Sequence, residues 1–204
     1  MLARLLDLLF PARDDERALR GLPAEGLLPL LEPELAPLGG GESAVVLMRY
    51  ADSRVRAAIH EAKYRGSERA FSLLAEALAE YLRDEPLKRA RLLPLPLGKA
   101  RRRERGYNQA EEVARRAGQA LTIPLETALL ARTRETRSQV SLPRWRRKQN
   151  MRGAFRCAEN AAPDPALLYI VVDDVLTTGA TLRAATSALR AAGAARILAI
   201  ALAH

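Results

Sequence analysis

The chain has 204 residues, a length that fits one domain or one domain with a small appendage. Hydrophobic residues make up 49% of it, enough for one buried core. The net charge of +9 is uneven: residues 87–157 hold 19 Lys and Arg against 5 Asp and Glu, and the remainder of the chain is acidic. We therefore expect one region of the molecule to meet an anionic partner.

Composition excludes several classes of protein. No apolar run reaches the roughly 18 residues of a membrane span, and residues 1–10 are typical of a short amphipathic helix and are too charged for a signal peptide. The single cysteine, Cys157, excludes a disulfide within this sequence, and two histidines argue against a histidine-built metal site. An aromatic content of 4% disfavours a base-stacking surface. We expect a cytoplasmic α/β protein.

The first half of the chain predicts one strand and two helices after an irregular start. Residues 11–43 contain five prolines and the triplet Gly39–Gly41, which predicts a linker or a loosely packed cover with short helical pieces. Residues 44–50 are a strand candidate. One helix is expected from Asp52 or Ser53 to Gly66, and a second begins after a Ser67 cap.

The basic central block is harder to interpret. A strand within residues 91–97 should end at Pro94. Residues 98–106 predict a basic loop, and Asn108 begins a capping box for a helix that runs to about Leu121. Residues 129–150 predict a loop with a short helix near 143–149, and a strand is expected within 153–157.

The last third predicts a parallel strand–helix–strand unit. Residues 167–172 and 197–202 are apolar and β-rich, as strands buried on both faces are, and a helix with its apolar face at Leu182 and Leu189 lies between them. Asp173 and Asp174 follow the first of these strands, and residues 177–181 form a turn.

This turn has the chemistry of a phosphate site. Ligands of parallel sheets bind at the carboxyl ends of strands, and the amino terminus of the following helix offers unpaired N–H groups. The hydroxyls of Thr177, Thr178 and Thr181 could hold a phosphate, Gly179 permits close approach, and the acid pair could accept hydrogen bonds from a ribose diol or orient Mg²⁺. The alternative is that the acids are turn residues and the threonines helix caps.

The segment Val171-Val-Asp-Asp-Val-Leu-Thr-Thr-Gly-Ala-Thr181 resembles the phosphoribosyl pyrophosphate (PRPP) motif of type I phosphoribosyltransferases. Further segments resemble one branch of them, the ComF family of bacterial competence proteins. These are Tyr50 with Ile59–Gly66, Leu93–Leu97, Arg105–Ala110, Arg132–Gln139 with Leu142, Arg147 and Asn150, and Gly153–Phe155. The resemblance implies a type I phosphoribosyltransferase-like parallel sheet flanked by helices in residues 44–204, with a small N-terminal appendage in residues 1–43.

The resemblance also implies roles for particular residues. Asp173 and Asp174 would be catalytic and bind the ribose of Mg²⁺-PRPP, and Thr177, Thr178, Gly179, Ala180 and Thr181 would bind its 5′-phosphate. Pyrophosphate would face Pro96, Leu97, Arg103, Arg105 and Lys63. For each of these the alternative is structural: a proline-rich strand end, a solvated charge run, or a lysine at a helix end. Asn108 caps a helix in either case.

The sequence departs from the family at its N-terminus. Many ComF proteins carry a four-cysteine zinc ribbon soon after a Leu-Phe-Pro segment. Here Leu9–Pro11 is followed by Ala-Arg-Asp-Asp-Glu with no cysteine near it, so no zinc is expected. The implied function is glycosyl transfer from Mg²⁺-PRPP to an unidentified acceptor, linked to DNA uptake. The rival is a non-enzymatic competence factor that senses a phosphorylated metabolite or associates with single-stranded DNA. Residues 133–149 would either close over substrate or contact nucleic acid, and the oligomeric state stays open.

Overall fold

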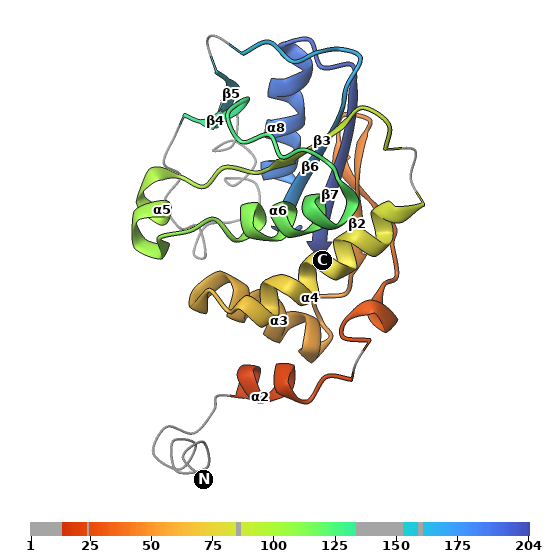
Figure 1. The fold of residues 1–204 in the computed structure, drawn as a ribbon. Coiled ribbons are helices and arrows are strands. Elements are labelled where there is room, and N and C mark those ends of the chain that lie inside the picture. The colour runs from red at the N-terminus through yellow and green to blue at the C-terminus, as the bar shows by residue number, and fades with distance from the viewer. Residues whose placement is uncertain (1–13, 24, 85–86, 134–152, 159–160) are drawn as a thin grey trace.

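The computed structural model describes residues 14–23, 25–84, 87–133, 153–158 and 161–204 (Figure 1). A central sheet has the strand order β1-β2-β7-β6-β3. Strands β2, β7, β6 and β3 are parallel, and β1 is antiparallel to β2. The strands are β1 (Glu34–Gly39), β2 (Glu42–Met48), β3 (Ala90–Pro94), β6 (Leu168–Val175) and β7 (Arg196–Ala203).

Helices cover both faces of this sheet. Ile170 and Val172 of β6 pack into the core with α3 (Ser53–Arg65), α4 (Glu68–Arg83) and α6 (Gln109–Leu121). Tyr169 and Val171 point to the other face, toward α8 (Ala180–Ala191) and the small antiparallel pair β4 (Leu130–Arg132) and β5 (Phe155–Cys157). Figure 1 shows β4 and β5 beside α8, at the end of the molecule opposite α2 (Asp14–Arg20). The predicted parallel sheet flanked by helices is confirmed.

The capping residues explain why α3 and α4 begin and end where they do. The Asp52 carboxylate accepts a hydrogen bond from the Arg54 N–H at 2.8 Å, and Gly66 ends α3 in the left-handed conformation. The Ser67 hydroxyl then accepts from the Ala70 N–H at the start of α4. These contacts confirm both predicted helices, and they place Lys63 in the last turn of α3.

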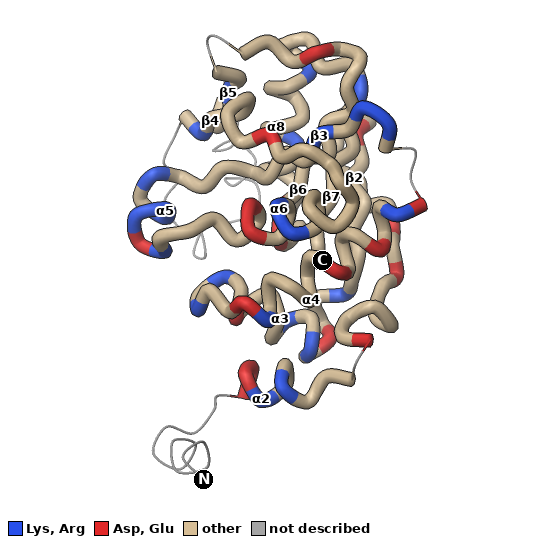
Figure 2. The backbone as a smooth tube through the Cα atoms, in the orientation of Figure 1, with Lys and Arg blue, Asp and Glu red and all other residues tan. Residues whose placement is uncertain are grey.

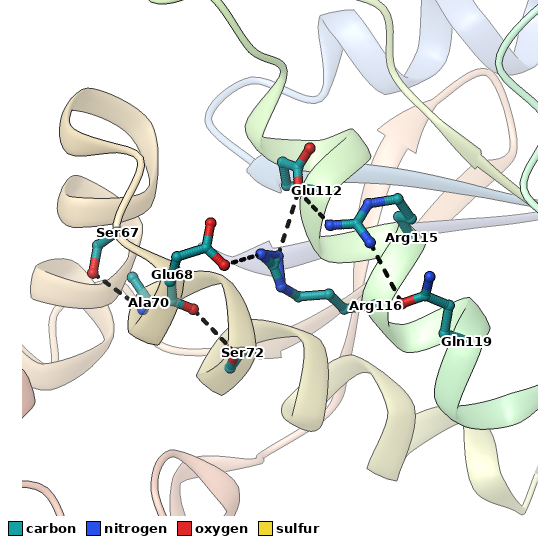
Figure 3. A network of polar contacts seen from close by, with 8 residues as sticks. All are labelled: Ser67, Glu68, Ala70, Ser72, Glu112, Arg115, Arg116 and Gln119. Atoms are coloured by element: carbon teal, nitrogen blue, oxygen red, sulfur yellow. Dashed lines mark hydrogen bonds and ion pairs between the residues drawn. The ribbon is translucent and has the colours of Figure 1, made fainter.

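Helices α4 and α6 are joined by a polar network as well as by apolar contacts (Figure 3). Arg116 donates to Glu112 on its own helix and to Glu68 on α4. Its guanidinium also lies over the Phe71 ring, 5.1 Å from the centroid. Because the Arg116 side chain is only 17% exposed, solvent screens its pair with Glu112 less than the pair between Arg115 and Glu112.

Residues 34–43 are not part of a linker, and this corrects the prediction for residues 11–43. Residues 34–39 form edge strand β1, and Gly39, Gly40 and Gly41 turn the chain into β2 with positive φ angles. The prolines misled the prediction because Pro37 is tolerated on an edge strand, where its missing N–H breaks no central ladder. The register is irregular between Pro37 and Gly39. The rest of the segment contains α2 and the short 3₁₀ helix η1 (Leu28–Leu30).

The predicted basic loop at residues 98–106 is also wrong, because residues Lys99–Arg105 form helix α5. Arg, Lys, Ala and Glu are good helix formers. Gly98 precedes the helix and Gly106 ends it in the left-handed conformation. The strand expected within 153–157 is confirmed as β5, and β4 occupies residues 130–132 of the predicted loop. The helices predicted for 1–10 and 143–149 lie outside the described residues.

Candidate functional site

The acid pair lies at the carboxyl end of the parallel sheet. Strand β3 ends at Pro94, opposite Val172, so Asp173 and Asp174 continue β6 beyond its neighbour on that side. The two acids lie within the last residues of β6, which ends at Val175, so they stand at the end of the strand, as the sequence predicted. Asp174 is buried and Asp173 is partly buried. This is the edge at which ligands of parallel sheets bind.

Three elements converge on the Asp174 carboxylate. Its Oδ2 lies 3.1 Å from the Lys63 ammonium at the end of α3, and it accepts a hydrogen bond of 2.8 Å from the Gln109 amide at the start of α6. Its Oδ1 accepts from the Val175 N–H. Burial by itself would raise the pKa of Asp174, but Lys63 and Gln109 hold that pKa below its usual value. Asp174 is therefore a charged group inside the protein.

Asp173 has the opposite character. Burial, together with the negative charge of Asp174, raises the pKa of Asp173 to about 7, while its Oδ1 accepts the Asp174 N–H at 2.9 Å. Near neutral pH the pair therefore carries between one and two negative charges, balanced in part by Lys63. One carboxyl that accepts hydrogen bonds and one that can also donate them suit the two hydroxyls of a sugar diol.

Arg105 reaches the same site through Gln109. The Arg105 guanidinium donates to Gln109 Oε1 at 3.0 Å and lies over the Tyr64 ring, 5.3 Å from its centroid. An arginine can only donate and a carboxylate can only accept, so these two partners fix the orientation of the Gln109 amide. Arg103, the other arginine predicted to face pyrophosphate, is exposed on α5 and is not part of this chain of contacts.

Asn108 holds the segment after β3 against α6. Its Oδ1 caps α6 by accepting from the Ala110 N–H, as predicted, and its Nδ2 donates to the Leu95 carbonyl at 2.9 Å. The Leu95 N–H donates to Val172, the residue before the acid pair. Pro96 and Leu97 follow at once and are half-buried. The predicted pyrophosphate segment is thus fixed beside the end of β6.

The hydroxyl-rich loop occupies residues 176–179, and α8 begins at Ala180. The Thr178 hydroxyl accepts from the Ala180 N–H at 3.4 Å, while Thr177 is exposed and Thr181 half-exposed in the first turn. Gly179 has a φ of 70°, and a Cβ there would lie 2.7 Å from the Leu38 side chain. Gly179 thus permits both the turn and its close approach to β1.

Sequence reasoning missed Gln109 and Tyr64. Gln109 stands directly after the capping residue Asn108. The signal available in the sequence was an amide side chain in the first turn of a helix; its contact with Asp174 is seen only in the structure. Tyr64 follows Lys63 and is 56% exposed. It lies outside the apolar face that predicts the helix, so the sequence pattern did not distinguish it.

A separate hollow of about 490 Å³ lies along α8. Arg183, Ser187 and Glu42 contribute its polar surface, and Gly39 and Phe155 line it from β1 and β5. It reaches the first residue of α8, Ala180, and does not include the acid pair.

The fold and the site define an α/β protein that presents two unequal carboxylates, a lysine and the hydroxyl-rich loop at the carboxyl end of parallel strands.

In a search of protein-family models, none matches the chain. It is 35% identical to "Competence protein F" of Haemophilus influenzae over 102 residues, which are 50% of this chain and 44% of that protein. It is 33% identical to "DNA utilization protein YhgH" of Salmonella typhi over 149 residues, 68% of this chain and 62% of the relative. The chain is a homologue of these proteins, which confirms the resemblance to the ComF family. It spans between about half and three fifths of the length of these relatives.

Two solved structures are similar to parts of this chain. One is the allosteric regulatory enzyme of purine biosynthesis, with a TM-score of 0.46 and 18% identity over 70% of this chain and 30% of that one. The other is adenine phosphoribosyltransferase from Leishmania tarentolae, with a TM-score of 0.43 and 14% identity over 83% of this chain and 94% of that one. Among the described residues, no helix is long and apolar enough to cross a membrane.

Proposed function

We propose that the chain binds a phosphorylated ribose, PRPP in particular, and that it is a phosphoribosyltransferase-like protein connected with DNA use. The observation that carries this proposal is the convergence of Lys63 and Gln109 on Asp174 at the end of β6, directly before the hydroxyl-rich loop. The acid pair would accept the ribose hydroxyls, and the first turn of α8 with Thr177, Thr178 and Thr181 would hold the 5′-phosphate. The connection with DNA comes from the names of the homologues.

In an active enzyme, a nitrogen nucleophile would attack C1 of the ribose while the bond from C1 to the pyrophosphate oxygen breaks. The chain's own part would be to position the two reactants and to neutralise charge. Arg105 would face the leaving pyrophosphate, because its guanidinium can form two hydrogen bonds with one phosphate group. Pro96 and Leu97 would bring backbone groups near it.

The residues present fit a magnesium ion that arrives with the diphosphate. Mg²⁺ keeps several waters and takes only one or two protein carboxylates. The Asp174 oxygens already accept from Lys63, Gln109 and Val175, whereas the contact described for Asp173 engages only Oδ1. Asp173 would therefore be the residue that helps to hold the ion. When bound, Mg²⁺ would neutralise part of the charge on the leaving pyrophosphate.

Calorimetric titration with Mg²⁺ and PRPP tests the proposal. Wild-type protein should bind, and Asp173→Asn and Asp174→Asn should each weaken binding by at least about tenfold, because each removes an ionisable acceptor of the ribose hydroxyls. Asp84→Asn, at the exposed end of α4, is the matched control and should bind like wild type. Unchanged affinity in both site variants would remove the basis of the proposal.

Pyrophosphate release separates an enzyme from a sensor that uses the same pocket. Incubation with Mg²⁺-PRPP and a panel of nucleobases should release pyrophosphate above the background of Asp174→Asn if the chain is a transferase. Retained PRPP binding without release from any acceptor in the panel would favour the sensor.

Association with single-stranded DNA is the second candidate function, and helix α5 favours it. Figure 2 shows Lys and Arg gathered on α5, and Lys99, Arg102 and Arg103 are exposed there. Each phosphate contact adds about 0.7 to the slope of log affinity against log salt for single strands. A Lys99→Gln/Arg103→Gln variant should therefore lower that slope by about 1.4, whereas Arg83→Gln/Lys88→Gln should not. The basic residues within 144–148, also predicted to contact DNA, lie outside the described residues.

A further inference from the structure

Helices α2 and α3 meet at a cluster of metal-ligating side chains that is separate from the acid pair. Asp15 on α2 and His60 and Glu61 on α3 each offer one ligand atom, and these three atoms all lie within 4.8 Å of one another. Among the residues that the structure describes, they are the three His, Cys, Asp or Glu side chains close enough to share a metal ion. One imidazole nitrogen and two carboxylate oxygens are donors that Zn²⁺ takes in proteins.

The ring nitrogen of His60 in this cluster makes no hydrogen bond. His60 Nδ1 is buried without a hydrogen-bond partner, although Asp15 Oδ2 lies only 2.8 Å from it. The two atoms are therefore close, but their orientation is not that of a donor and an acceptor. A buried nitrogen that makes no hydrogen bond costs free energy unless another partner takes its lone pair, and a metal ion is such a partner.

Neighbouring contacts hold the ligands in position. The Tyr64 ring lies against the His60 ring, with 4.8 Å between the centroids. Asp14 and Glu16, on either side of Asp15, pair with arginines of their own helix, whereas the contact described for Asp15 crosses to α3. The three ligands are thus brought together by the fold itself, and an ion would find them already assembled.

The later part of α2 is anchored by other contacts. Leu19 is buried in the core with residues of α3 and α4, and Arg69 Nε donates to the Leu19 carbonyl at 3.0 Å. At the start of the helix, the described contact with α3 is the one that Asp15 makes. A helix of seven residues is too short to be stable alone. An ion at the cluster would therefore fix the end of α2 that Leu19 does not reach.

Charge and distance also favour a divalent ion. Two carboxylates and a neutral imidazole carry two negative charges, which one divalent cation neutralises. Around a tetrahedral Zn²⁺ with bonds of about 2.0–2.1 Å, ligand atoms lie about 3.3 Å apart. The contact between His60 and Asp15 is slightly shorter than this spacing. A pair of ligand atoms 4.8 Å apart would have to close by about 1.5 Å, which side-chain rotation permits.

We propose that Asp15, His60 and Glu61 bind a divalent transition-metal ion, Zn²⁺ in particular, which ties the start of α2 to α3. An imidazole ligand favours Zn²⁺ over Mg²⁺, which takes oxygen ligands, so the site differs in chemistry from the acid pair, and it is independent of the proposed function. The sequence argued against zinc because the chain has two histidines and no cysteine cluster. This site needs one histidine and no cysteine, and only the fold brings Asp15 to it.

Zinc titration of the full chain tests the proposal. Wild-type protein, freed of metal with EDTA and then dialysed, should bind about one equivalent of Zn²⁺ by calorimetry in a large excess of Mg²⁺, which occupies sites made of oxygen ligands alone. His60→Gln and Asp15→Asn should each weaken that binding at least about tenfold, because each removes a ligand. The matched controls are His204→Gln, which removes the other histidine, and Asp14→Asn, which removes the exposed acid beside Asp15; both should bind like wild type.

Hydrogen exchange tests the tie between the helices with wild-type protein alone. Amide exchange in residues 14–20 should be slower in Zn²⁺ than in EDTA, because the ion restrains α2. Wild-type protein that binds no Zn²⁺ at micromolar concentrations, or site variants that bind it like wild type, would overturn the proposal and leave an ion pair between protonated His60 and Asp15. Binding without slower exchange in α2 would overturn the tie. The wild-type measurements decide the question even if a variant does not fold.

Discussion

At the scale of single residues, two adjacent and chemically identical side chains have different properties because their neighbours differ. Asp174 receives hydrogen bonds or charge from Lys63, Gln109 and Val175, whereas Asp173 receives one backbone N–H and lies beside a negative charge. The motif in the sequence places both acids at a strand end, but it cannot show which one is ionised. That assignment depends on α3 and α6, which lie far away along the chain.

The pKa of Asp173 predicts a pH dependence of stability. Folding raises that pKa from 3.8 to about 7, so the folded chain holds a proton that the unfolded chain has lost. Stability should therefore fall as pH rises from about 4 to about 7, by an amount on the order of 1–3 kcal/mol for this group. Urea unfolding of wild type and Asp173→Asn across this pH range measures the effect. As the pH rises, the free energy of unfolding of the variant should increase relative to that of wild type. The same comparison with Asp84→Asn should show no such trend, and parallel curves for Asp173→Asn would contradict the raised pKa.

Gln109 provides a second prediction at this scale. Gln109→Glu replaces the amide donor that lies 2.8 Å from Asp174 with a carboxylate. Because that places two negative groups together in a buried site, we expect a loss of about 2–3 kcal/mol of unfolding free energy at neutral pH. The loss should shrink in acid, where the new carboxyl is protonated. Gln119→Glu, at the exposed end of the same helix, should stay within about 0.5 kcal/mol of wild type. Equal effects in the two variants would refute the role of the Gln109 amide.

At the scale of elements, the sequence predicted those whose ends carry a cap and whose apolar residues repeat regularly. Helices α3, α4 and α6 begin after Asp52, Ser67 and Asn108, as expected. Strands β6 and β7 are continuous apolar runs. The elements missed were β1, where Pro37 and the glycines of its turn resemble a linker, and α5, where seven residues hold five basic side chains and no buried face. Neither has the periodicity on which such a prediction depends.

The loop before α8 depends on an element that the sequence did not predict. Gly179 has a φ of 70°, and a Cβ there would lie 2.7 Å from Leu38 on β1. Gly40→Ala should cost about 1–2 kcal/mol from its positive φ alone, since a Cβ there meets nothing within 4 Å. Gly179→Ala should cost about 1–2 kcal/mol more, because of the contact with Leu38. Urea denaturation of both variants measures the difference. In a double-mutant cycle, Gly179→Ala should cost less in the Leu38→Ala background than in wild type, because the second cost is then relieved. Equal costs in the two single variants would show that β1 does not pack against the loop.

At the scale of the whole molecule, the basic residues of the central block fall into two groups: those joined to the acid pair and those that face solvent. Arg105 lies in the central basic block and connects to the acid pair through Gln109, so it belongs to the site. Lys99 and Arg103 lie in the same block but face solvent on α5. The count of basic residues could predict an anionic partner, but only the contacts separate an arginine that is joined to the acid pair from basic residues that face solvent.

The organisation of the molecule gives the last prediction. Residues 1–43 were expected to form an appendage, yet β1 is an edge strand of the central sheet, and Leu38 is 4% exposed in the core beneath α8, whereas Leu35 on the same strand is 75% exposed. If this strand is part of the folded unit, Leu38→Ala should lower the free energy of unfolding by about 2–4 kcal/mol, because it opens a cavity between the sheet and α8. Leu35→Ala should change it by less than about 0.5 kcal/mol. Both variants should unfold in a single transition when followed by circular dichroism and by fluorescence. Near-neutral effects of both substitutions would show that the sheet is stable without β1, and that the boundary at residue 43 describes the folded unit after all.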